Sequence, residues 1–109
     1  MFSGVFLNIK KSIIKQFKNS GIEIIEIEDK KFIPDDSKFL VLNYDEDVFS
    51  ICHAVKKKSK DIFILVLKDK HDKIESITRE EKKWFKADIV INLPINELQI
   101  KHILETIYD

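Results

Sequence analysis

The sequence is poor in the residues that would place it in a special class of protein. It has only two glycines, two prolines and one cysteine among 109 residues. The isolated Gly4 and Gly21 cannot build a GxGxxG motif or a Walker A loop, which excludes nucleotide binding by those routes. Cys52 has no partner for an internal disulfide, and the first 20 residues lack the uninterrupted apolar core of a secretory signal. We therefore expect a cytoplasmic location.

Charge and hydropathy argue against nucleic acid and membranes as partners. The basic and acidic residues number 19 each, so the formal net charge is zero. Nothing draws the chain as a whole toward nucleic acid or an anionic membrane surface. No apolar run approaches the roughly 20 residues that cross a bilayer. The 44% hydrophobic content is sufficient for one core at this length, so we expect a single domain over residues 1–109.

Short apolar runs rich in β-branched residues alternate with segments of helical periodicity. That alternation is typical of βα units wound into a parallel sheet with helices on both faces. The third and fourth runs are nearly continuous in apolar residues, as central strands require, and the second alternates Ile with Glu, as an edge strand does. The predicted strands are Val5–Ile9, Ile22–Ile27, Phe39–Asn43, Ile62–Leu67 and Asp88–Asn92.

Helical periodicity fills all but one of the connections between these strands. The predicted helices are an apolar stripe of Ile13, Ile14 and Phe17 that ends before Gly21, the segment Val48–Ser59, a segment marked by Ile74, Ile77, Trp84 and Phe85, and a last helix capped by Asn96 and Gln99. The exception is the stretch 28–38, where Pro34 and paired acids leave room for one helical turn at most. The second helix is therefore predicted to be shortened or absent.

Few residues indicate chemistry. Cys52 and His53 are adjacent, and neighbours on a helix point about 100° apart, so they cannot pair as nucleophile and base. We expect Cys52 to pack in the core. The three histidines lack metal-ligand spacing, so no metal site is predicted. Asp45, Glu46 and Asp47 follow the third strand, at the sheet edge where open α/β folds bind ligands. No second acidic cluster is evident to complete a cation site, so we expect these carboxylates to cap and start the next helix.

The strand order and one C-terminal stretch resemble receiver domains of two-component signalling. Receiver domains carry a Gly-Ala-Asp segment before strand five, followed after it by Lys-Pro, an apolar residue and a helix cap. Here the stretch is Lys86-Ala87-Asp88, then Leu93-Pro94-Ile95-Asn96. The resemblance implies a three-layer, doubly wound, five-stranded parallel sheet of the flavodoxin-like type, in the order 2-1-3-4-5. Its specific part covers about 11 residues.

The residues that take part in phosphorylation of receiver domains are absent from the matching positions of this sequence. The family holds Mg²⁺ with two acids after strand one, where this chain has Asn8-Ile9-Lys10-Lys11. The acceptor Asp falls on Asn43, the hydroxyl after strand four falls at Leu67, and the lysine before the proline is Leu93. Without acids, the cation that neutralises a transferring phosphoryl group lacks ligands. The resemblance thus implies a pseudo-receiver that is not an enzyme, needs no cofactor and acts by protein contact.

Two alternatives remain open. A shift of two residues offers Asp45 as the acceptor, which would make the chain an active receiver domain that needs Mg²⁺. The second alternative is a flavodoxin-like domain that binds a small ligand at the carboxyl ends of its strands.

In the family, signals leave through the face formed by helix four, strand five and helix five, which dimerises or contacts a partner. Leu98 lies nearly opposite the apolar stripe of the last helix, so we expect it to be exposed. Trp84 and Phe85 are consecutive and cannot both face the core. The candidate contact residues on this face are Trp84, Ile95 and Leu98.

Overall fold

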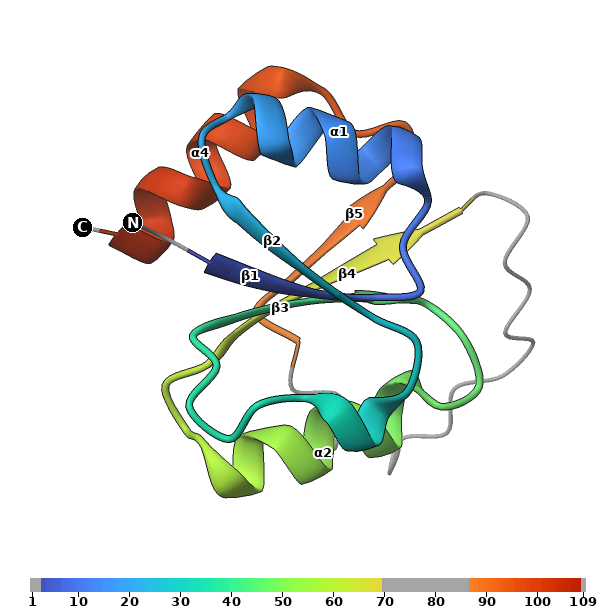
Figure 1. Ribbon diagram of the computed structural model, residues 1–109. Helices are drawn as coiled ribbons and strands as arrows, with labels where there is room; N and C mark the ends of the chain where they lie inside the picture. The colour runs from blue at the N-terminus through green and yellow to red at the C-terminus, as the bar shows by residue number, and fades with distance from the viewer. Residues whose placement is uncertain (1–2, 70–86, 109) are drawn as a thin grey trace.

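The computed structural model describes residues 3–69 and 87–108, which form a parallel sheet covered on both faces by helices (Figure 1). The strands are β1 (Ser3–Leu7), β2 (Glu23–Ile27), β3 (Phe39–Asn43), β4 (Phe63–Lys68) and β5 (Ile89–Asn92). They lie in the order β2-β1-β3-β4-β5, and every adjacent pair is parallel. The predicted flavodoxin-like receiver fold is confirmed.

The helices divide between the two faces of the sheet. Figure 1 shows α1 (Lys11–Asn19) and α4 (Glu97–Tyr108) together on one face, and α2 (Val48–Lys58) on the other. Between β2 and β3 the chain forms only the 3₁₀ turn η1 (Lys30–Phe32), on the same side as α2. The predicted shortening of the second helix is therefore confirmed. The helix predicted around residues 74–85 lies outside the described residues.

Two apolar cores flank the sheet, because alternate side chains of each central strand point to opposite faces. The cluster under α1 and α4 includes Phe6, Phe17 and Phe39, and the rings of Phe6 and Phe17 meet edge to face with centroids 5.1 Å apart. The cluster under α2 contains Leu40, Leu42, Val48, Cys52, Ile64 and Val66. Both faces of β3 and β4 are buried, as their continuous apolar sequences predict.

One strand differs from its prediction by two residues at both ends. We expected a strand at Val5–Ile9, and β1 spans Ser3–Leu7. Asn8 has φ +52°, a left-handed conformation that Asn tolerates better than most residues and that ends the extended backbone. Ile9 is nevertheless buried, which explains why the apolar pattern continues past the strand.

Local signals at two helix ends agree with the structure. The Asn96 backbone N–H donates to Gln99 Oε1 at 2.9 Å, and the Gln99 N–H donates to Asn96 Oδ1 at 2.8 Å, so the predicted capping box starts α4. Gly21 follows α1 with φ +89°, a conformation that favours glycine. Among the described helices, none has the length and apolar character needed to cross a membrane.

Candidate functional site at the carboxyl edge of the sheet

The positions of the predicted degenerate phosphorylation pocket lie at the carboxyl edge of the sheet. Asn43 is the last residue of β3 and stands opposite Leu67 on β4. Leu93 directly follows β5, where its N–H donates to the Lys68 carbonyl at 2.8 Å. Asn8 and Lys10 lie between β1 and α1. Parallel strands thus bring together residues that are far apart in sequence.

Two asparagine side chains fasten the loops at this edge to one another. Asn43 Nδ2 donates to the Asn8 carbonyl oxygen at 2.9 Å. Asn8 Nδ2 in turn donates to the Glu28 carbonyl at 3.1 Å, and the Asn8 N–H donates to the Ile27 carbonyl at 3.0 Å. The ends of β1, β2 and β3 are therefore linked through carboxamide donors. A carboxylate at position 43 would have no proton to donate to the same carbonyl.

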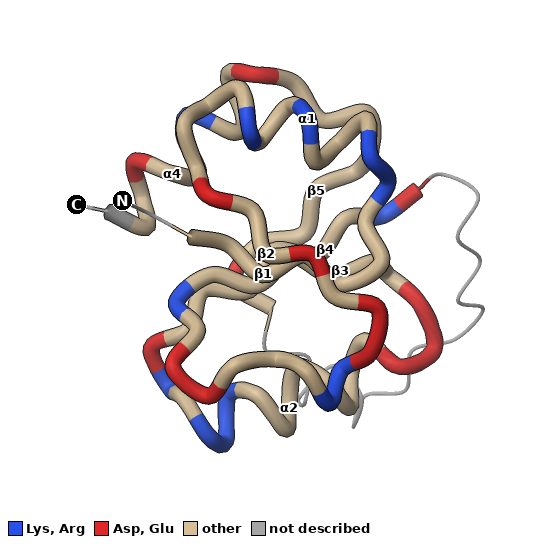
Figure 2. The backbone as a smooth tube through the Cα atoms, in the orientation of Figure 1, with Lys and Arg blue, Asp and Glu red and all other residues tan. Residues whose placement is uncertain are grey.

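A cavity of about 280 Å³ opens beside these asparagines, and we call it the carboxyl-edge cavity. It is strongly acidic, and Figure 2 shows acidic stretches after both β2 and β3 on this side of the molecule. Among the described residues that line it, Lys30 is the single basic one. The lining residues are Leu7, Asn8, Glu28, Asp29, Lys30, Leu42, Asn43, Asp45, Asp47 and Ile51.

A second pair of acids, which the sequence analysis did not recognise, lies beside Asp45 and Asp47. Glu28 and Asp29 line the same cavity, because β2 ends at the same edge as β3. The Glu-Asp pair at the end of the second predicted strand was the available signal, since carboxyl ends of parallel strands meet. Even so, within residues 3–69 and 87–108 no group of three His, Cys, Asp or Glu side chains is arranged to hold a metal ion.

Asp45 lies in the loop beyond β3, two residues after its end. One carboxylate oxygen, Oδ1, accepts the Asp47 N–H at 3.0 Å, which closes a local turn before α2. Asp47 occupies the N-cap position of α2, yet its side chain makes no capping hydrogen bond. The prediction that these acids start the helix is right in position. The expected side-chain cap is replaced by the turn at Asp45.

Lys10 and Leu93 line a second cavity at the same edge, of about 320 Å³. Lys10 Nζ lies 3.9 Å from Asp69 Oδ2, and both side chains are solvent-accessible. The Gln16 side-chain amide donates to the Ile95 carbonyl at 3.1 Å and closes one wall. The predicted pocket residues therefore occupy two cavities: Asn8 and Asn43 line the first, and Lys10 and Leu93 line the second.

Three candidate residues are placed very differently by burial. Leu67 is 1% exposed and belongs to the core under α1 and α4, so its side chain does not line either cavity. Ile95 is 4% exposed and packs in the same core, which corrects its selection as a contact residue. Leu98 is 76% exposed, as predicted. Trp84 lies outside the described residues.

Cys52 is packed in the core under α2, as predicted. Burial raises the pKa of its thiol to about 12, with the nearby positive charge of Lys56 acting in the opposite direction. A neutral buried thiol is a poor nucleophile. His53 next to it is exposed, so the two side chains do not form a catalytic pair.

Asp88 has a structural role that the sequence analysis did not assign. Its Oδ2 accepts the Ile64 N–H at 2.7 Å and the Lys56 ammonium at 2.9 Å. Lys56 also donates to the Ile62 carbonyl at 2.6 Å. This cluster connects the C-terminal part of α2 to the amino ends of β4 and β5. The Ala-Asp pair that carried the family resemblance therefore includes a residue that positions α2.

Solved structures of receiver domains share this fold. The chain matches a response-regulator receiver domain protein from Clostridium thermocellum with a TM-score of 0.75 and 8% identity, over 98% of this chain and 94% of that one. It matches a beryllofluoride-activated DrrB receiver domain with a TM-score of 0.69 and 17% identity, over 98% and 97% of the two chains. The chain therefore has the response-regulator receiver fold.

A third structure places this fold within a longer protein. The chain matches NtrX from Brucella abortus, solved in complex with ADP, with a TM-score of 0.74 and 15% identity. The match covers 98% of this chain and 26% of NtrX, so the chain spans about a quarter of that protein. No protein-family model matches the sequence, and no curated protein matches it.

Proposed function

We propose that the chain is a cytoplasmic pseudo-receiver domain of two-component signalling, which accepts no phosphoryl group and acts by protein contact. The observation that carries the proposal is the Asn43 side chain at the end of β3. Its carboxamide donates a hydrogen bond to the Asn8 carbonyl, and so links the end of β3 to the loop after β1. A carboxamide is also no useful nucleophile toward phosphorus.

The surroundings of Asn43 support the same conclusion. A phosphoryl group is an anion, and in the carboxyl-edge cavity it would meet four acidic side chains and one lysine. Phosphoryl transfer in such a place needs a cation. Lys10 stands where the family has an acid, and it extends toward Asp69 in the neighbouring cavity. Leu93 stands where the family has a lysine that would contact the transferred group.

Phosphodonor experiments test the claim that the chain accepts no phosphoryl group. We expect no chemical-shift changes in the amide spectrum when Mg²⁺ and beryllofluoride are added, and no phosphoryl adduct in the intact mass after incubation with acetyl phosphate. Shift changes confined around Asp45, or an adduct lost in Asp45→Asn and retained in Asp47→Asn, would overturn it in favour of an active receiver. Thermal stabilisation by one member of a nucleotide panel would instead support a ligand-binding domain.

We propose that the contact surface is the face that contains β5 and α4, because receiver domains dimerise or contact partners through the corresponding face. Within the described residues, this face has two exposed large apolar residues, Val90 of β5 and Leu98 of α4, which are 41% and 76% exposed. Leu98 is the more exposed of the two. We expect Leu98→Asp to weaken self-association in sedimentation velocity, or partner capture. Lys57→Asp, at an exposed position of α2 on the other face of the sheet, should leave both unchanged. Equal behaviour of the two variants would remove Leu98 from the contact surface.

A further inference from the structure

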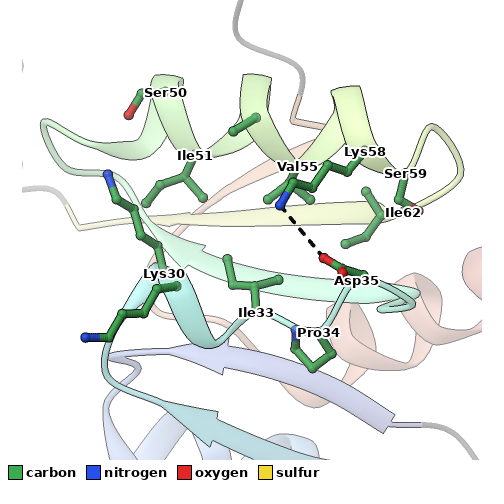
Figure 3. Close-up of a pocket in the computed structure, with 12 residues that line it drawn as sticks. Lys30, Ile33, Pro34, Asp35, Ser50, Ile51, Val55, Lys58, Ser59 and Ile62 are labelled. Carbon is green, nitrogen blue, oxygen red and sulfur yellow. Dashed lines mark ion pairs between the residues drawn. The ribbon is translucent and has the colours of Figure 1, made fainter.

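A groove separates η1 from α2 on the face of the sheet opposite α1 and α4, and Figure 3 shows the residues around it. Its volume is about 350 Å³. A three-residue turn covers less of this face than a full helix would, so the flank of α2 stays open. We call it the η1–α2 groove; its described lining is Lys30, Lys31, Ile33, Pro34, Asp35, Ser50, Ile51, Ala54, Val55, Lys58, Ser59 and Ile62.

The walls of the η1–α2 groove are aliphatic. Figure 3 shows Ile51, Val55 and Ile62 on one side of it, facing Ile33 on the other. Ile51 and Ile62 are buried and form the base. Val55 and Ile33 are half-buried, so each presents part of its apolar surface to the open space. An apolar side chain entering between them would remove this surface from water, which is favourable by about 25 cal/mol per Å².

The rim of the groove is basic. Among the described residues, three lysines and one carboxylate, that of Asp35, line it. Lys31 Nζ also lies 3.9 Å from the Asp29 carboxylate, outside this lining, and both of those side chains are exposed. Lys58 Nζ lies 3.8 Å from Asp35 Oδ1, and both side chains are highly exposed, at 74% and 88%. An exposed pair at this distance contributes little and is easily exchanged for another carboxylate. On a chain whose net charge is zero, this rim is a local positive site suited to acidic groups.

The lining argues for a peptide rather than a small molecule. Small-ligand sites orient their ligands with a few fixed polar groups inside a mostly apolar pocket. Here none of the described residues that line the groove is a buried polar or charged residue. The charges sit instead on long, exposed side chains at the rim, where they can meet carboxylates on either side of an inserted aliphatic residue.

We propose that the η1–α2 groove binds a short segment of a partner protein in which aliphatic side chains alternate with acidic ones. The aliphatic side chains fill the space between Ile33 and Val55, and the carboxylates pair with Lys30, Lys31 and Lys58. This surface lies apart from the β5 and α4 face. It adjoins the carboxyl-edge cavity through Lys30 and Ile51, which line both, but neither Asn8 nor Asn43 lines the groove. The inference therefore does not depend on the loss of phosphorylation or on the role of Leu98.

Peptide binding followed by amide chemical shifts tests the inference. The probe is a pool of short synthetic peptides in which Leu, Ile or Val residues are flanked by Asp or Glu. We expect shifts at Ile33, Ala54, Val55 and Ile62, and weaker binding as salt is raised, because exposed charge pairs are screened. A matched pool with Asn and Gln in place of the acids should bind at least about tenfold more weakly, a difference of about 1.4 kcal/mol.

Two exposed lysines on α2 provide a matched pair of variants. Lys58→Glu reverses a rim charge and should weaken binding of the acidic pool about tenfold. Lys57→Glu makes the same change in net charge outside the groove and should leave binding within about twofold, a difference below 0.5 kcal/mol. Both variants are at exposed helix positions and are expected to fold, which circular dichroism checks.

Several outcomes would overturn the inference. One is the absence of shifts with the acidic pool, and another is equal binding of the acidic and amide pools. A third is an equal loss of affinity in Lys57→Glu and Lys58→Glu. Concentration-dependent shifts at the groove without any peptide, together with a dimer in sedimentation, would assign the groove to a second copy of this chain.

Discussion

The carboxyl-edge cavity and the η1–α2 groove are hollows of similar size in one domain, yet their chemistry is opposite. The first is acidic, and its amide groups hold the loops after β1, β2 and β3 together. The second is aliphatic with a basic rim, and its apolar side chains remain partly exposed. The comparison teaches that side-chain hydrogen bonds join the loops at the carboxyl edge, while the short η1 turn between β2 and β3 leaves an apolar surface open beside α2.

The largest expected effect concerns the ion pair that holds α2, and thus one wall of the groove. Asp88→Ala removes the acceptor of the Ile64 N–H and leaves the Lys56 ammonium, 17% exposed, with the Ile62 carbonyl as its described partner. We expect a loss of about 2–3 kcal/mol in the free energy of unfolding, measured with urea. Asp35→Ala at the groove rim should change it by less than about 0.5 kcal/mol. Similar values for both would show that Asp88 does not anchor the helix.

At the carboxyl edge, Asn8 carries both a left-handed backbone and a side-chain hydrogen bond. Asn8→Ala should destabilise the fold by about 1–2 kcal/mol, because alanine is strained at φ +52° and cannot donate to the Glu28 carbonyl. Asn8→Gly relieves the strain and should lose only the hydrogen bond, so it should be the more stable of the two variants in urea unfolding. The reverse order would contradict a left-handed Asn8.

Substitutions of Asn43 test whether its carboxamide hydrogen bond holds the loops at the carboxyl edge together. Asn43→Ala removes its donation to the Asn8 carbonyl and should cost about 1 kcal/mol in the free energy of unfolding. Asn43→Asp should cost at least as much near neutral pH, because a carboxylate there would face a carbonyl oxygen and the other acids of the cavity. If Asn43→Asp instead stabilised the protein in the presence of Mg²⁺, the edge would retain a cation site.

The smallest effect near neutral pH concerns the inner face of α2, where Cys52 is buried. Its raised thiol pKa, about 12 in the fold against 9.0 for an ordinary thiol, means that above pH 9 the unfolded chain ionises and the folded chain does not. Cys52 therefore contributes no pH-dependent loss of stability below pH 9, and a loss as pH rises from about 9 toward 12. We expect a disulfide reagent to modify Cys52 at pH 8 only as fast as the protein opens. Rapid modification in native conditions would show that α2 is loosely packed on its inner face.

Local signals predicted much of the fold. The apolar runs predicted β3 at its observed bounds, because both faces of that strand are buried and every position is apolar up to Asn43. The capping box at Asn96 and Gln99 predicted the start of α4, because the two reciprocal hydrogen bonds involve only neighbouring residues. The end of β1 was missed because Ile9 continues the apolar pattern after the backbone has turned at Asn8.

The candidate site was less predictable, because its geometry depends on loops that meet only in the folded chain. Sequence position placed Asn8, Asn43 and Leu93 at one edge. It could not show that the two asparagines are linked by a hydrogen bond, or that Lys10 and Leu93 line a separate cavity. Strand order did offer Glu28 and Asp29 as neighbours of the acids after β3, although at least 15 residues lie between them along the chain, and that signal was missed.

By itself the sequence determined the βα order, the shortened second helix and the burial of Cys52, because each depends on local periodicity and on the polarity of single residues. Only the tertiary structure decided the partners of Asn43 and Asp88, the burial of Ile95 and the opening of the η1–α2 groove. These depend on which segments pack side by side, and contacts between distant segments leave no periodic pattern in the chain.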